Sequence, residues 1–194
     1  MERLAAFARR HELFIIADEV YKEFTYDGRR HRSVLELPGM EANVLVVDSV
    51  SKRFSACGAR IGAVISRNPE VMAAILKFGQ ARLCPPTLEQ LGAIAAYRLP
   101  ESYFDAVRAE YQQRRDVLFD ALTQDPRIVL RKPRGAFYMI VKMPGIADAD
   151  HFTRWLLSDF EVDGETVMLA PANGFYATHA AGHYEVRIAY VLDT

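Results

Sequence analysis

The segment VVDSVSKRFSACGARIG, residues 46–62, joins a buried strand to an abrupt run of polar and cationic residues. The apolar run ends at Val47, and Lys52 follows shortly after it. Lysine is among the side chains least often fully buried, so a strand that leads straight into one needs an explanation. The segment is either a solvated loop or a site that holds an anion beside an amine. Arg60 favours the site, because a guanidinium buried among its small and apolar neighbours requires an anionic partner.

The composition is that of a folded protein with one large or two small domains. The chain has 194 residues, of which 51% are hydrophobic and 25% charged, and its formal net charge is −1. This balance does not favour nucleic acid or an anionic membrane as a partner, and no apolar run reaches the roughly 20 residues of a membrane helix. Cys57 and Cys84 lack CxxC spacing, which favours a reducing compartment, and Cys57 is expected to be a small buried residue. We therefore expect a cytoplasmic protein.

Strand and helix patterns alternate in the first part of the chain, which predicts an α/β sheet. After Pro126 the pattern changes to that of a smaller α+β unit, and the boundary is expected within the long helix around residues 101–123. The expected strands are residues 13–18, 43–51, 59–66, 127–133, 135–143, 167–172 and 185–192. A first helix is expected to end near His11, and further helices are expected at residues 69–83, 87–99, 103–122 and 148–160.

Several polar side chains follow the predicted strand ends, which is where ligands bind in open α/β sheets. Asp18 ends the first strand and is either the N-cap of a following helical turn or a carboxylate that faces a ligand. Tyr21 lies on the same side of that turn. Lys52 follows the second strand, where burial and cationic neighbours make a lysine a nucleophile toward carbonyl groups. Ser49 and Ser51 add hydroxyl donors for an anion.

Arg187 repeats the pattern of an arginine inside an apolar strand. It either pairs with a carboxylate such as Glu185 or captures the carboxylate of a substrate through two parallel hydrogen bonds. His179 and His183 have the four-residue spacing of some metal-binding pairs. Gly182 interrupts the helix that would align them, so no metal site is expected.

Three motifs, taken in order, resemble the class I aminotransferases, which are fold-type-I enzymes that use pyridoxal 5′-phosphate. DEVY at 18–21, SVSK at 49–52 and GARIG at 58–62 match that family's Asp-x-x-Tyr, its Ser-x-Ser-Lys and its arginine eight residues beyond the lysine. GAFY at 135–138 and the strand arginine Arg187 also match. The resemblance covers essentially the whole chain and is closest to an aspartate-aminotransferase-like branch.

The resemblance implies a role for each matched residue. Lys52 would form a Schiff base with the cofactor's aldehyde and then move the proton at the substrate Cα. Asp18 would face the pyridine nitrogen, and Tyr21 would bond to the phenolic oxygen. The other implied contacts are those of Ser49, Ser51 and Arg60 with the cofactor phosphate, of Arg187 with the substrate's α-carboxylate, and of Tyr138 or Phe137 with the substrate pocket.

The implied domains are residues 1–112, the C-terminal part of a large domain with a mainly parallel sheet and helices, and residues 113–194, most of a small α+β domain. Family members have a segment before DEVY with an Asn-Pro-x-Asn-Pro-x-Gly motif and a phosphate loop, and a final helix after the Arg187 strand. Neither is found here, so the resemblance implies the C-terminal portion of a subunit.

The implied activity is that of a transaminase, homodimeric in its full-length form, that moves an amino group between an L-amino acid, aspartate favoured, and a 2-oxo acid. Three alternatives stay open: a lyase or synthase on the same fold, the aminotransferase-like sensor domain of a transcription regulator, and a non-catalytic remnant. They stay open because the side chains around the substrate Cα determine the reaction, and these motifs do not determine those side chains.

Overall fold

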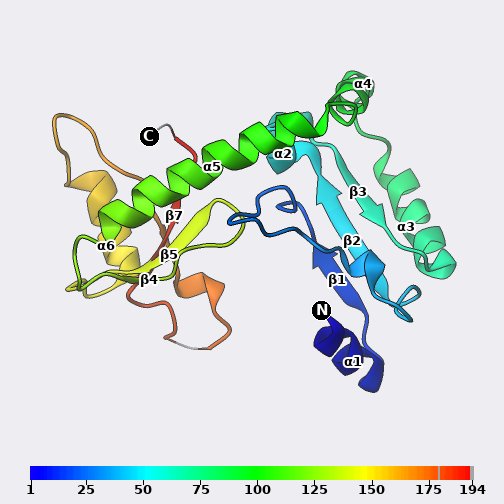
Figure 1. The fold of residues 1–194 in the computed structure, drawn as a ribbon, viewed down its shortest axis with the longest axis horizontal. Coiled ribbons are helices and arrows are strands. Elements are labelled where there is room, and N and C mark those ends of the chain that lie inside the picture. The colour runs from blue at the N-terminus through cyan, green and yellow to red at the C-terminus, as the bar shows by residue number, and fades with distance from the viewer. Residues whose placement is uncertain (179, 193–194) are drawn as a thin grey trace. The chain divides into compact units, whose positions relative to one another are not determined.

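The computed structural model describes residues 1–178 and 180–192, and these residues contain two separate sheets (Figure 1). Each sheet belongs to its own unit, Met1–Asp105 or Ala106–Thr194. The boundary between the units falls within α5 (Glu101–Leu122). The α/β class is confirmed, while the assignment of residues 1–112 to a large domain and 113–194 to a small domain stays a prediction.

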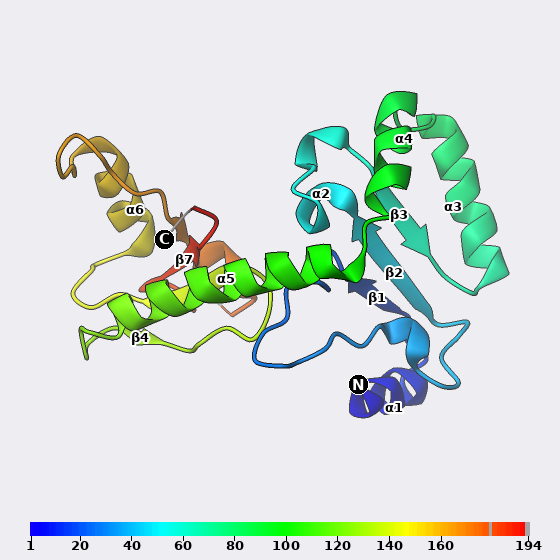
Figure 2. The same ribbon diagram turned by 45° about the horizontal axis from the view of Figure 1, so that its top comes forward.

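Strand β2 (Val44–Ser49) is the central strand of the first sheet, between β1 (Ile15–Asp18) and β3 (Gly62–Ile65). β1 pairs with β2 in parallel, and β3 pairs with β2 antiparallel. Figure 2 shows α2 directly at the end of β2, with α1 at the opposite end of the sheet. The helices that begin in this unit are α1 (Glu2–Arg10), α2 (Val50–Arg53), α3 (Pro69–Arg82), α4 (Thr87–Ala96) and α5, with short 3-10 turns at Val34–Glu36 and Cys57–Ala59.

The core of the first unit lies against one face of β2. Burial alternates along this strand, so that every second side chain, beginning with Val44, is buried. The apolar residues of this face pack against the buried side of α1 and against the segment that follows β1. The resulting core consists of Ala5, Ala8, Val34, Leu37, Met40, Val44 and Val46.

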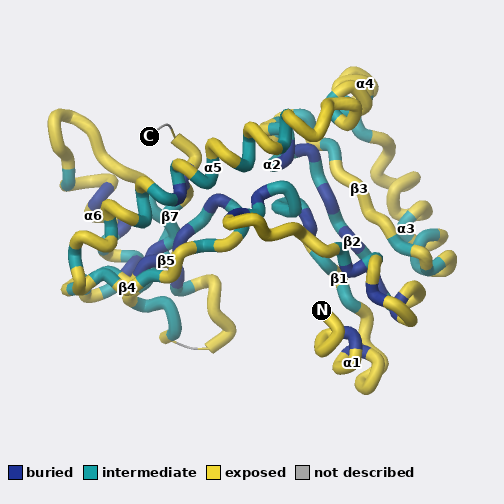
Figure 3. Tube along the Cα trace, in the orientation of Figure 1, coloured by how far each residue is buried: buried dark blue, intermediate teal, exposed yellow. Residues whose placement is uncertain are grey.

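Other elements of the first unit remain exposed (Figure 3). β3 is exposed at all of its residues, and neither α3 nor α4 contains a buried one. The predicted start of α3 is confirmed: Asn68 is the N-cap, its side chain accepts the Val71 N–H, and Pro69 occupies the first helical turn.

The second unit contains a four-stranded antiparallel sheet in the order β4-β5-β7-β6. Met139, Val141 and Val186 on one face of this sheet are fully buried, whereas Tyr138 and Arg187 lie on the other face because side chains alternate along a strand. The elements are β4 (Val129–Leu130), β5 (Tyr138–Lys142), α6 (Ala149–Ser158), β6 (Ala170–Pro171), a 3-10 turn (Asn173–Phe175) and β7 (Glu185–Ala189).

Asp18 caps the turn that follows β1, because its Oδ1 accepts the Val20 N–H at 3.2 Å, although this turn does not continue into a helix. Two expectations about strand ends were wrong. The second strand ends at Ser49, because α2 begins at the next residue, and the third begins only at Gly62, because the left-handed backbone of Arg60 (φ 55°) interrupts an extended chain.

Within the described residues, no helix has both the length and the hydropathy needed to cross a bilayer.

Candidate active site

Three strand ends of the first unit meet at one edge of its sheet. The parallel register places Asp18, the last residue of β1, opposite Val47. The antiparallel register places Ser49, the last residue of β2, opposite Gly62, the first residue of β3. Because ligands bind beyond the carboxyl ends of strands in α/β sheets, this edge is the candidate active site, and the segments that leave it carry every site residue predicted in this unit.

Ser49 ends β2 and caps the short helix α2. Its Oγ accepts the Ser51 N–H at 3.1 Å, as an N-cap does. The same hydroxyl donates either to Ser51 Oγ at 2.8 Å or to the carbonyl oxygen of Ile61 at 2.9 Å. The second contact ties the start of α2 to the residue that follows Arg60, so both predicted serines and the Arg60 segment lie together.

Lys52 lies in α2 with its side chain partly buried. Within residues 1–178 and 180–192 its ammonium makes no hydrogen bond or ion pair. Its sequence neighbour Arg53 differs, because that guanidinium pairs with the buried carboxylate of Asp48. A partly buried amine without an ionic partner is available to react with a carbonyl compound.

Arg60 is not buried, contrary to the expectation from its small neighbours. Its side chain is exposed, and Nη1 donates to the carbonyl oxygen of Cys57 at 2.8 Å. Among the described residues no carboxylate pairs with it. Its other N–H groups are thus available to an anion at the surface. Cys57 was also wrongly predicted to be buried, and both it and Cys84 are exposed thiols.

Asp18 and Tyr21 lie on the turn that leaves β1. The carboxylate of Asp18 is exposed and has no cationic partner in the described part of the chain. Tyr21 is partly buried, and its ring packs edge-on against Phe24 with centroids 6.2 Å apart. The carboxylate of Asp18 is thus open to a cationic group at the sheet edge.

A buried ion-pair cluster that the sequence reasoning missed lies behind these residues. The Asp48 carboxylate is 2.8 Å from Arg53 Nη2 and 3.2 Å from Lys22 Nζ, and it accepts the Ser49 N–H at 2.8 Å. Burial, followed by the nearby charge of Asp48, raises the pKa of the Tyr97 hydroxyl. The alternation along β2, which places Asp48 on the same face as Val44 and Val46, is the signal that would have revealed it.

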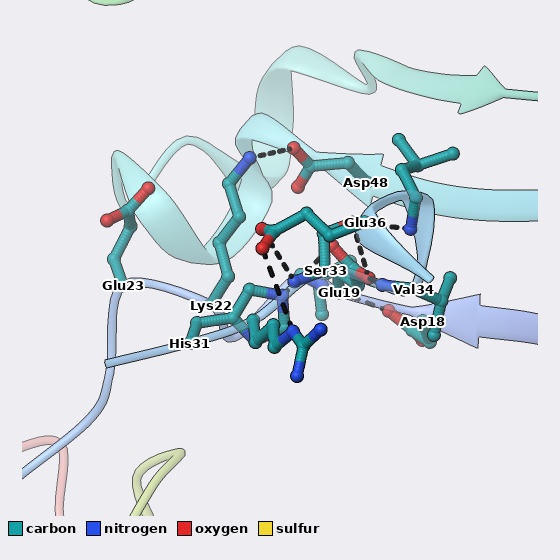
Figure 4. Close-up of polar contacts among 12 residues, drawn as sticks. Asp18, Glu19, Lys22, Glu23, His31, Ser33, Val34, Glu36 and Asp48 are labelled. Atoms are coloured by element: carbon teal, nitrogen blue, oxygen red, sulfur yellow. Dashed lines mark hydrogen bonds and ion pairs between the residues drawn. The ribbon is translucent and has the colours of Figure 1, made fainter. Parts of the chain in front are cut away.

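Glu19 is a second buried carboxylate next to Asp18 (Figure 4). It accepts hydrogen bonds from the Val34 N–H and the Ser33 hydroxyl, both at 2.9 Å, and lies 3.0 Å from Nε2 of His31. Burial raises the pKa of Glu19, but these partners together outweigh it, so the pKa is below the ordinary value. Glu19 therefore anchors the Asp18–Tyr21 turn to the segment around Val34.

Arg187 of the second unit does not pair with Glu185. Its guanidinium lies 4.4 Å from the ring centroid of Tyr138 and 4.8 Å from that of Phe175. In the described residues it makes no ion pair, and Glu185 instead accepts a hydrogen bond from the Tyr176 hydroxyl. A guanidinium packed against two aromatic rings keeps its N–H groups available for a carboxylate.

No metal site was predicted at His179 and His183. His179 lies outside the described residues, so the structure describes only His183. His183 Nδ1 lies 3.0 Å from the carboxylate of Asp148. The described residues contain no group of three or more histidine, cysteine, aspartate or glutamate side chains placed to bind a metal ion.

The sequence model of the family "Aminotransferase class I and II" matches residues 1–180. The chain is 32% identical over 187 residues to an aspartate aminotransferase of Geobacillus stearothermophilus, covering 93% of this chain and 45% of that protein. It is 31% identical to aromatic-amino-acid aminotransferase 2 of Thermococcus litoralis, covering 98% of this chain and 47% of that protein. The solved structure of an aromatic aminotransferase from Pyrococcus horikoshii superposes with a TM-score of 0.84 at 29% identity, covering 98% of this chain and 49% of the other.

The match over most of the chain defines a protein of the aminotransferase fold. The chain belongs to the class I and II aminotransferase family. It spans about half the length of the curated relatives that it matches. Members of the aspartate aminotransferase family depend on pyridoxal 5′-phosphate.

The side chains at the sheet edge fit this cofactor. Its aldehyde, pyridine nitrogen, phenolic oxygen and phosphate require an amine, a carboxylate, a hydroxyl and a set of anion donors. The edge offers these groups in Lys52, Asp18, Tyr21 and the group formed by Ser49, Ser51 and Arg60. The charges support this fit. Neither Lys52 nor Asp18 has an ionic partner among the described residues, whereas the buried side chains of Arg53 and Asp48 pair with each other.

Proposed function

We propose that this chain carries half of the catalytic apparatus of a pyridoxal-phosphate-dependent transaminase that moves an amino group between an L-amino acid and a 2-oxo acid. The observation that carries the proposal is the partly buried ammonium of Lys52 at the ligand edge of the sheet, which has no ionic partner in the described part of the chain and follows Ser49 and Ser51. Family membership supports the reaction class.

Each residue at the edge has a stated role in the proposed reaction. Bound pyridoxal phosphate supplies an electron sink for the electrons released when the substrate's Cα–H bond breaks. Lys52 would hold the cofactor through its amine and would act as the general base that moves the proton at the substrate Cα. Asp18 keeps the ring nitrogen protonated through an opposite charge, and Tyr21 bonds to the phenolic oxygen. Ser49, Ser51 and Arg60 bind the phosphate.

Substrate binding is assigned to the second unit. Arg187 binds the α-carboxylate, because its guanidinium is held by two rings and has no protein carboxylate as a partner within the described residues. Tyr138, one of those rings, lines the substrate position. Aspartate is the proposed amino donor, which the aspartate aminotransferases among the relatives support.

Covalent trapping tests the role of Lys52 without requiring turnover. The chain is incubated with pyridoxal phosphate, reduced with borohydride and mapped by peptide mass spectrometry. We expect the reduced adduct on Lys52, its loss in Lys52→Ala, and its retention in the control Lys77→Ala, which changes an exposed lysine of α3. Labelling spread over surface lysines, with Lys52 no more reactive than Lys77, would refute the proposal.

A panel of amino donors and oxo acids, assayed on the intact subunit, tests the substrate. We expect transfer from aspartate, and Arg187→Ala should raise the KM for the donor while Lys52 labelling is preserved. Amine release or decarboxylation without transfer to an oxo acid would instead indicate a lyase or synthase on the same fold.

We also propose that the intact subunit forms a homodimer. The exposed apolar side chains of α3 and α4, among them Phe78 at 77% and Leu88 at 79% relative exposure, support a contact with a second copy. Sedimentation velocity on the intact subunit tests this, and a monomer at micromolar concentration would contradict it.

A further inference from the structure

Asp48 occupies a position where a carboxylate is costly. It lies on the face of β2 that also carries Val44 and Val46, and its side chain is only 6% exposed. An ionised carboxylate removed from water to this extent is tolerated only with cationic or hydrogen-bonding partners. Asp48 has such partners from two other segments of the chain, so its burial links those segments.

The two cations that contact Asp48 are sequence neighbours of proposed site residues. Lys22, at 3.2 Å, follows Tyr21 on the turn that leaves β1, and Figure 4 shows its side chain reaching toward Asp48. Arg53, at 2.8 Å, follows Lys52 and is the last residue of α2. Asp48 itself precedes Ser49 and accepts its N–H. One buried carboxylate therefore connects the segments that hold the ring and the amine.

Helix α2 needs such an external contact to hold its orientation. Its four residues make barely one turn, and a helix this short has no stability of its own. The guanidinium of Arg53 is 6% exposed and lies over Tyr97, with 5.2 Å between its Cζ and the ring centroid. Consecutive residues of a helix differ by about 100° in direction. A fixed Arg53 therefore determines the direction in which Lys52 leaves the helix.

We propose that Asp48 is a positioning residue which, through Arg53 and Lys22, sets the orientation of α2 and hence the reach of the Lys52 amine toward the cofactor aldehyde. Asp48 contacts no cofactor or substrate atom in this scheme. The identity of the cofactor in this proposal rests on the proposed function. The link between Asp48 and the order of α2 is independent of that function.

The test compares Asp48→Asn with Asp116→Asn in the full chain. Asp116 is a matched control in the second unit, because it too bridges an arginine and a lysine, with 2.8 Å to both Arg115 and Lys132. The first readout is hydrogen exchange at the amides of Val50 and Phe54, a measurement that needs no cofactor. The second is the rate at which pyridoxal phosphate, trapped with borohydride, labels Lys52.

For Asp48→Asn we expect about tenfold faster exchange at these two amides, because α2 opens locally, and at least about fivefold slower labelling of Lys52. Asp48→Glu, which keeps the charge, should restore part of both. Asp116→Asn should change neither. If Asp48→Asn does not fold, Lys22→Met removes only the partly exposed partner and should give a smaller change in the same direction.

The outcomes separate the two proposals. If the unmodified chain is not labelled at Lys52, the proposed function fails, while the exchange rates still decide the role of Asp48. If Lys52 is labelled equally fast in the unmodified chain and in Asp48→Asn, with unchanged exchange in α2, the positioning role is wrong and the proposed function stands. Equal changes in Asp48→Asn and Asp116→Asn would also overturn it, because they would indicate a general loss of stability.

Discussion

Two carboxylates, Asp48 in the first unit and Asp116 in the second, each bridge an arginine and a lysine, but they differ in which group is buried. Asp48 and its arginine are both 6% exposed. Asp116 is 34% exposed, while Arg115 beside it is fully buried and also donates to the carbonyl oxygen of Pro133 at 2.9 Å. Asp48 is thus the centre of its cluster, although Arg53 Nε also lies 3.3 Å from Glu23 Oε1, and Arg115 is held beyond Asp116 by the Pro133 carbonyl.

The difference shows how similar ion pairs serve different purposes. Arg115 and Asp116 are neighbours on one helix, so their contact adds little to the tertiary structure. Asp48 instead contacts residues from the turn after β1 and from α2, which the chain brings together only on folding. The loss of Asp48 should therefore affect the sheet edge and its chemistry, and the loss of Asp116 should affect only the local stability of the second unit.

The largest expected difference is in stability. Asp48→Asn should lower the free energy of unfolding of the first unit by about 3 kcal/mol, because it leaves Arg53 as a buried charge without its closest partner. Asp116→Asn should cost only about 1 kcal/mol, because water reaches this carboxylate. Urea unfolding followed by circular dichroism reports on both units, and the single tryptophan, Trp155, reports on the second. Equal losses from the two substitutions would mean that the two carboxylates contribute equally to stability.

A smaller difference is expected in acid. The folded-state pKa of Glu19 is below its ordinary value of 4.5, so this group contributes stability at pH above that value and loses it as pH falls through the lower, folded pKa. Glu19→Gln should remove this acid sensitivity from the circular dichroism transition.

Asp116 provides the counterpart in the second unit. Burial raises its pKa, but the bonds from Arg115 and Lys132 outweigh this, and the folded pKa is below 3.8. Asp116→Asn should therefore reduce the acid-induced loss of stability of the second unit only below about pH 3.8, as followed by the fluorescence of Trp155. A steeper acid loss in either variant would contradict the assigned direction.

The smallest expected effects are those of the two lysines. Lys22→Met and Lys132→Met should each cost about 1 kcal/mol or less, because both side chains reach solvent. In 1 M NaCl, where the screening length is about 3 Å, the cost of Lys132→Met should vanish while that of Lys22→Met largely persists, because the partner of Lys22 is buried. Urea titrations at low and high salt measure this, and equal salt sensitivity would mean that Asp48 is as accessible as Asp116.

Much of the fold was predictable because local patterns encode it. The apolar runs before Asp18 and Ser49 are strands, and both residues mark strand ends at the same sheet edge. The family resemblance rested on the order of motifs on either side of these ends, and the match to residues 1–180 confirms it. The roles of the individual site residues stay predictions.

Other features depended on tertiary contacts that no local pattern contains. Small, apolar neighbours suggested a buried Arg60, but the left-handed backbone there turns its side chain to solvent and to the Cys57 carbonyl. The alternation along β2 placed Asp48 on the buried face, yet its cationic partners come from separate segments, and only the folded chain shows which ones meet it.

The antiparallel pairing of Ser49 with Gly62 closes only the short segment 50–61. The entropy lost in closing a loop grows with its length, and contacts between residues close in sequence form quickly. The residues proposed to bind the phosphate and the aldehyde are thus assembled by a hairpin that needs little of the rest of the chain. Asp18 joins them through parallel pairing that spans the longer segment 19–43 and through the contact of Lys22 with Asp48. We therefore expect the carboxylate side of the site to form after the hairpin.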